Sequence, residues 1–146
     1  MDNNLLLSLS WNQSLDIQEN AICEIASMNL LNPKDLLQPS RKEYWENAAK
    51  VLIKMGYPRI KESISGLLIW LQDMNWPGSN VVIEILRSLP KAVFIPHLEC
   101  AVLEAMNTND DIWLSNLSII LTQCNLKEID FISKDVYLTL LDIKEV

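Results

Sequence analysis

The sequence predicts an all-α domain in which antiparallel helix pairs stack into an α-α superhelix of the HEAT/armadillo type. Apolar residues recur at the three- and four-residue spacing of a helix along most of the chain. Only 3 of the 146 residues are glycine and 6 are proline, which is too few for a fold of many short strands. Tryptophan also recurs at nearly constant intervals. We expect about seven helices in a single helical-repeat domain, residues 1–146.

The first three expected helices are marked by apolar spacing and by residues that begin or end helices. The first covers about residues 14–28, and residues 33–37 add a short helical turn. The second begins at Ser40, which forms a capping-box pattern with Glu43, and ends before Gly56. The third spans about residues 60–71 and contains Gly66. Since glycine inside a helix costs about 1 kcal/mol relative to alanine, we expect another helix to approach closely at Gly66.

Four further helices complete the expected pattern. Asn75 is expected to cap a helix that ends before Pro90, and Pro96 to open the next one. The last two are expected at about residues 111–124 and 133–141. The segment Ile129–Ile132 is the only candidate strand, and it is too short to matter.

Four tryptophans stand at or just before the start of an expected helix. Trp11, Trp45, Trp76 and Trp113 follow one another at intervals of 34, 31 and 37 residues. A helix-turn-helix unit that recurs every 30 to 45 residues is typical of helical repeats, in which stacked pairs bury a continuous core. The alternative is an irregular helix bundle in which these intervals arise by chance.

The net charge is −7 and the sequence pI is about 4.6. Nucleic-acid binders normally carry a basic face that neutralises phosphates, so we expect no nucleic-acid partner. From Leu98 onward there are nine acidic residues against three lysines. A solvated surface explains this acidity simply, but the same surface would suit a cationic partner.

The three cysteines indicate a reducing compartment. Cys23, Cys100 and Cys124 form no CxxC pair, and we expect buried, reduced thiols. The N-terminus lacks the basic segment of a signal peptide. The longest uncharged run, residues 112–126, contains several polar side chains and cannot span a bilayer. We therefore expect a cytoplasmic protein without a membrane partner.

Three segments resemble a known family. They are residues 45–49 (WENAA), 56–59 (GYPR) and 67–78 (LLIWLQDMNWPG). They resemble a bacterial family of small proteins classed as a domain of unknown function, over roughly residues 40–124. The resemblance implies a HEAT-like superhelix, and it carries no catalytic residues to this chain.

One turn is the first candidate for a binding site. Two indoles and three polar side chains stand close together in sequence, at Trp70, Gln72, Asp73, Asn75 and Trp76. Tryptophan is common at binding hot spots because it combines a large apolar area with one polar group. The alternative is structural: Asp73 and Asn75 satisfy helix-end amides, and both indoles pack between helix pairs.

Other chemical groups indicate no catalytic or metal site. His97, Glu99 and Cys100 form the only cluster of histidine, cysteine and acid, and we interpret them as a helix-start histidine and a buried cysteine. Asp110 and Asp111 precede a helix, where capping explains them. The glycines are too scattered for a phosphate loop. We expect no metal and no cofactor.

These patterns favour a non-enzymatic protein–protein interaction module, acting as a monomer or a homodimer. Glu104, Asp110 and Asp111 form a candidate acidic face for a protein partner. A more specific hypothesis is an immunity-type protein that occludes a cationic toxin. The alternative is a small-ligand binder or enzyme that uses the turn from Trp70 to Trp76.

Overall fold

The structure, a computed structural model, describes residues 1–145 of the chain and, in this range, is helical throughout without any strand. The predicted all-α class is confirmed. The α-helices are α1 (Asn3–Ser8), α2 (Leu15–Ala26), α3 (Trp45–Met55), α4 (Ile64–Trp70), α5 (Ser79–Ser88), α6 (Lys91–Asn107), α7 (Asp111–Gln123) and α8 (Lys134–Glu145). Four short 3₁₀ helices stand at Pro33–Leu36, Lys42–Tyr44, Lys61–Ser63 and Glu128–Asp130. Helix α1 was not predicted. The segment Ile129–Ile132, the one candidate strand, forms no strand, and its first two residues belong to the 3₁₀ helix Glu128–Asp130.

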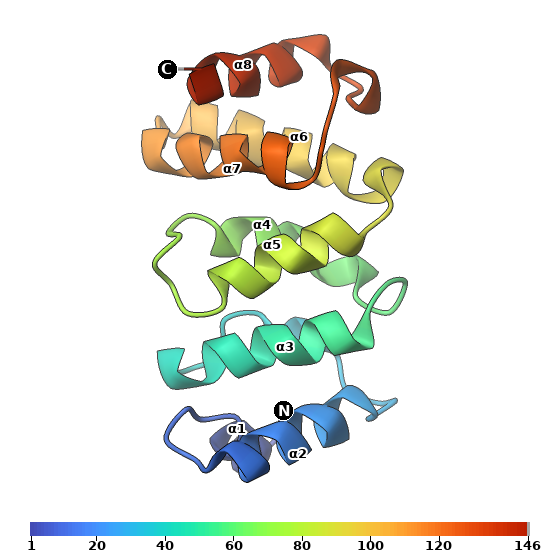
Figure 1. Cartoon of the computed structure of the whole chain (residues 1–146), viewed down its shortest axis with the longest axis vertical. Coiled ribbons are helices and arrows are strands. Elements are labelled where there is room, and N and C mark those ends of the chain that lie inside the picture. Colours follow the sequence, from blue (N-terminus) through green and yellow to red (C-terminus); the bar gives the residue numbers. More distant parts are fainter. Residues whose placement is uncertain (146) are drawn as a thin grey trace.

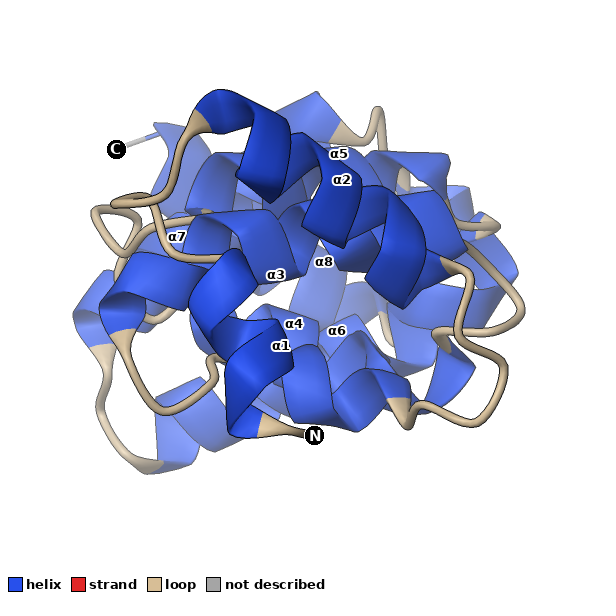
Figure 2. Cartoon of the chain, turned by 90° about the horizontal axis from the view of Figure 1, so that it is seen from below, coloured by secondary structure: helices blue, strands red, loops and turns tan. Residues whose placement is uncertain are grey.

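The helices stack along the long axis of the molecule in chain order (Figure 1). Helices α2, α3, α5 and α7 form one layer, and α1, α4 and α6 lie behind it. The view along the stack shows α1, α4 and α6 on one side and α2, α3 and α5 on the other (Figure 2). The 3₁₀ helix at residues 33–36 packs on α3. Helix α8 packs on α7 and α6 at the end of the stack.

Three of the four recurring tryptophans, Trp45, Trp76 and Trp113, contact a neighbouring helix pair. Trp113 is buried, and its indole Nε1 donates to the backbone oxygen of Leu68 at 3.0 Å, which ties α7 to α4. The Trp45 indole instead donates locally, to Pro39 O at 2.7 Å in the segment that leads into α3. Trp11 differs, because 53% of it is exposed. The 30–45-residue spacing thus coincides with stacked helical units, while the HEAT/armadillo type stays a prediction.

The structure explains the glycine inside α4. A Cβ atom at Gly66 would lie 2.4 Å from Leu37 Cδ1, which is closer than a van der Waals contact allows. The expected close approach is therefore present, but it comes from a side chain in the segment before α3 rather than from a helix.

Three predicted helix starts are wrong in detail. Ser40 caps no helix. The carboxylate of Glu43 instead accepts hydrogen bonds from Ser10 Oγ (3.1 Å) and Asn12 Nδ2 (2.8 Å), because α1 and α2 bring these groups to it. Asn75 is not a cap either, since α5 begins after Gly78 in a left-handed conformation. Pro96 lies inside α6, which already begins at Lys91.

The cysteines also differ from expectation. Cys124 is buried, but Cys23 and Cys100 are exposed. Burial raises the pKa of the Cys124 thiol, and the positive charges of Arg87 and Lys91 partly offset this effect. None of the described helices combines the length and the apolar character needed to cross a bilayer.

Candidate functional site

The tryptophan turn joins α4 to α5. Trp70 is fully buried, and its Nε1 donates to Pro77 O at 2.9 Å, so the indole closes the turn from inside. Its ring meets the edge of Trp45 at a centroid distance of 6.0 Å. Trp76 is half-buried and meets the same Trp45 ring at 5.7 Å, nearly perpendicular. The three indoles form one aromatic cluster between α3 and the turn.

The polar residues of the turn differ in their roles. Asp73 Oδ1 accepts from the backbone nitrogen of Asn75 at 2.8 Å, which is an Asx turn. Asn116 of α7 donates to the backbone oxygens of Leu71 and Gln72 at 2.8 and 3.3 Å. The side chains of Gln72 and Asn75 make no hydrogen bond within residues 1–145. The five predicted residues therefore share one turn, but Trp70 faces the core rather than solvent.

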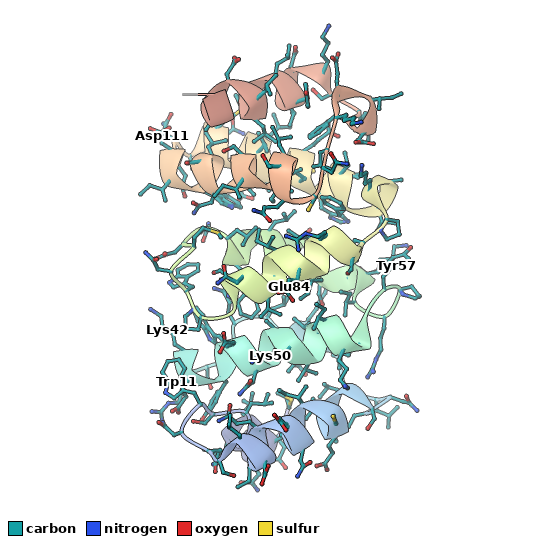
Figure 3. All side chains as sticks on the ribbon, in the orientation of Figure 1. Trp11, Lys42, Lys50, Tyr57, Glu84 and Asp111 are labelled. Carbon is teal, nitrogen blue, oxygen red and sulfur yellow. The ribbon has the colours of Figure 1, made fainter. Side chains whose placement is uncertain are left out.

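The predicted acidic face lies at the end of α6 and the start of α7. Asp110 Oδ1 accepts from Trp113 N at 3.0 Å and so caps α7. Asp111 and Glu104 are exposed, and neither carboxylate has an ion pair or a hydrogen bond in the described part of the chain. Asp111 stands at the edge of the stack (Figure 3). The structure thus brings two unpaired carboxylates to one end of a helix pair.

Exposed apolar side chains accompany these carboxylates. Ile112 is 71% exposed, and Leu103 and Met106 are also exposed. The connecting loop is held by its own backbone, since Asp110 N donates to Ala105 O at 2.8 Å and Thr108 N to Glu104 O at 3.0 Å. We call Leu103, Glu104, Met106, Asp111 and Ile112 the acidic end. These residues lie on the last turn and a half of α6 and the first turn of α7, so the acidic end is a mixed apolar and negative group at the junction of the two helices.

Sequence reasoning missed a notch between α5 and α7. It is a cavity of about 240 Å³ that Met74, Ile83 and Ile119 line with apolar surface. Asn80, Glu84, Arg87 and Gln123 supply its polar groups. Asn80, Glu84 and Arg87 are spaced by four and three residues, so their sequence already predicts one polar stripe on α5. Nothing in the sequence indicated that α7 lies opposite.

A smaller cavity of about 70 Å³ lies between α4 and α6. Ser65 Oγ and His97 Nδ1 lie 3.0 Å apart at its edge, and Cys100 and Glu104 also line it. Glu99 points elsewhere, because its carboxylate accepts from Ser133 N at 2.5 Å. No group of three or more histidine, cysteine or acidic side chains in the described residues is placed to hold a metal ion.

A family model described as a domain of unknown function, DUF5071, matches residues 37–136. The chain belongs to this family. The match covers α3 to α7 and the start of α8, and it includes the aromatic cluster and the tryptophan turn. The predicted membership in a family of unknown function is therefore confirmed. No curated protein and no solved structure matches the chain.

Proposed function

We propose that this chain is a non-enzymatic protein-interaction module and that its acidic end receives a cationic surface of a partner protein. One observation carries the proposal: at the junction of α6 and α7, the exposed carboxylates of Glu104 and Asp111 have no partner among the described residues, and Ile112, next to Asp111, is 71% exposed. In its most specific form, the partner is a cationic toxin that the chain occludes.

The physical argument combines two contributions. Unpaired surface carboxylates attract a cationic partner and orient it, which raises the association rate and selects against acidic partners. Apolar side chains that become buried on binding supply much of the affinity. Because backbone hydrogen bonds already hold the connection between α6 and α7 at residues 108–110, binding loses little conformational entropy there.

The predicted alternative places a small-ligand or catalytic site at the tryptophan turn. The contacts of this turn favour a structural role instead, in which the turn connects neighbouring helix pairs. Trp70 is fully buried, Asp73 stabilises the turn itself, and Asn116 fastens the turn to α7. We therefore place the binding function at the acidic end, where the side chains have no internal partners.

The test is photo-cross-linking with benzoylphenylalanine at position 112, in cells of the source organism. The same group at Ile17, an exposed position on α2, serves as the control. We expect a protein with a basic surface to cross-link at position 112 and not at position 17.

A charge-reversal pair then tests the role of the carboxylates. Glu104→Lys with Asp111→Lys should abolish the cross-link, whereas Glu19→Lys with Glu24→Lys should preserve it. The second pair makes the same charge change at exposed sites on α2. An unchanged cross-link in the first pair, or an equal loss in both, would refute the acidic-end proposal.

A further inference from the structure

The notch between α5 and α7 has features that a simple packing gap does not need. Helix α5 packs closely on α3 and less closely on α7, which leaves the cavity of about 240 Å³ open to solvent. Its floor contains Ile83, which is almost buried, and Ile119, which is 38% exposed. Glu84 of α5 is exposed, and Figure 3 shows it in the part of the stack next to Lys50 of α3. The notch therefore joins an apolar floor to a charged rim.

Opposite charges line this rim without neutralising each other. Glu84 and Arg87 are three residues apart on α5, and they form no ion pair. Arg87 instead crosses to α7: its Nε donates to the backbone oxygen of Gln123 at 2.9 Å and its Nη2 to Gln123 Oε1 at 2.6 Å. These bonds hold the guanidinium in place at one end of the notch.

The hydrogen-bonding groups that remain are divided by sign. At the Arg87 end, Arg87 Nη1 and Gln123 Nε2 are donors without a partner in the described structure. Toward the start of α5, the Glu84 carboxylate and the Asn80 amide oxygen are acceptors without one. The notch thus presents donors for an anion, acceptors for a cation, and an apolar floor on which a side chain can lie.

We infer that this notch binds a free α-amino acid with an apolar side chain of about the size of leucine. Its carboxylate meets Arg87 and Gln123, its ammonium meets Glu84 and Asn80, and its side chain covers Ile83 and Ile119. The volume suits such a ligand, because pockets for drug-sized molecules begin at about 300 Å³.

Other ligands match the notch less well. A lysine side chain of a partner protein would pair with Glu84 but would face the positive charge of Arg87. An acidic side chain would pair with Arg87 but would face the negative charge of Glu84. A residue inside a peptide chain carries neither terminal charge, so it would leave both groups unmatched. A zwitterion pairs with both Glu84 and Arg87 at once. This inference does not depend on the proposal for the acidic end.

The experiment is an NMR titration of the ¹⁵N-labelled chain with L-leucine, L-leucinamide and N-acetyl-L-leucine. Leucinamide lacks the carboxylate and acetylleucine lacks the ammonium. We expect saturable shifts of the Asn80, Glu84 and Gln123 amides with leucine, with a dissociation constant on the order of 1 mM. Each analogue should bind about twofold to fivefold more weakly, as partly exposed ion pairs contribute modestly.

Glu84→Gln locates the ammonium. The variant should weaken leucine binding about twofold to fivefold, and it should not weaken the binding of acetylleucine, which has no ammonium to pair with Glu84. Glu24→Gln, an exposed acid on α2, is the matched control and should change neither. The inference is overturned if leucine produces no saturable shifts, if the shifts lie away from α5 and α7, if both analogues bind as tightly as leucine, or if Glu84→Gln leaves leucine binding unchanged.

Discussion

Replacing Trp113 with phenylalanine tests whether the recurring tryptophans join the stacked helix pairs. The side chain is 1% exposed, and its Nε1 donates to Leu68 O at 3.0 Å across the α4–α7 boundary. The lost hydrogen bond costs about 0.5–1.5 kcal/mol. Leu68 O keeps a second donor, the backbone nitrogen of Leu71 at 3.1 Å, so no orphaned acceptor adds to this cost.

The missing ring of the indole adds a packing loss. Full truncation of a buried aromatic side chain costs about 3–5 kcal/mol, and phenylalanine removes only part of the indole, so we assign about 1–2 kcal/mol to this loss. The free energy of unfolding should therefore fall by about 1.5–3.5 kcal/mol in total. For a chain of this length, the melting temperature should fall by about 5–11 °C.

The assay is urea denaturation followed by circular dichroism at the helix band. Trp11→Phe is the matched control, because Trp11 is 53% exposed and its indole nitrogen makes no hydrogen bond in the described residues. It should change the free energy of unfolding by less than about 0.5 kcal/mol. Equal effects of the two substitutions, or a Trp113→Phe effect below that limit, would refute the role of Trp113 as a joint.

Two further predictions concern the tryptophan turn and the thiols. Asp73→Ala should lower the free energy of unfolding by about 1 kcal/mol, because it removes the Asx-turn acceptor, whereas Asn75→Ala should have almost no effect. Thermal denaturation checks this pair, and equal losses would contradict the assigned roles. N-ethylmaleimide at pH 8 should modify Cys23 and Cys100 well before Cys124. The raised pKa leaves Cys124 with less thiolate, so its modification rate should keep rising at pH values where an ordinary thiol is already ionised. Mass spectrometry measures the three rates, and equal rates would contradict this prediction.

The outcome at Ser40 and Glu43 shows where local patterns are insufficient. The two residues match a capping box, yet Glu43 binds Ser10 and Asn12 instead. A capping box gains its stability from contacts within four residues, so a distant partner that offers better hydrogen bonds can replace it. The sequence contained both partners, but their proximity arises only when α1 and α2 pack beside α3.

The acidic end could be predicted from the sequence, whereas the notch could not. Glu104 and Asp111 flank one short loop, so local sequence alone was enough to group them as a candidate acidic face. The notch joins α5 to Gln123 of α7, which lies 36 residues beyond Arg87. No local pattern links these positions, and the exposed polar stripe on α5 alone gave no reason to expect a cavity.

The sequence by itself determined the all-α class, the position of most helices and the family. Helical periodicity and tryptophan spacing depend on residues that are close along the chain, and such signals survive without knowledge of the fold. Tertiary structure alone decided that Trp70 faces the core, that Glu43 binds the loop between α1 and α2 rather than capping its own helix, and that α5 and α7 leave a charged notch between them. Periodicity states which face of a helix is apolar, but only packing determines which helix covers that face and how closely.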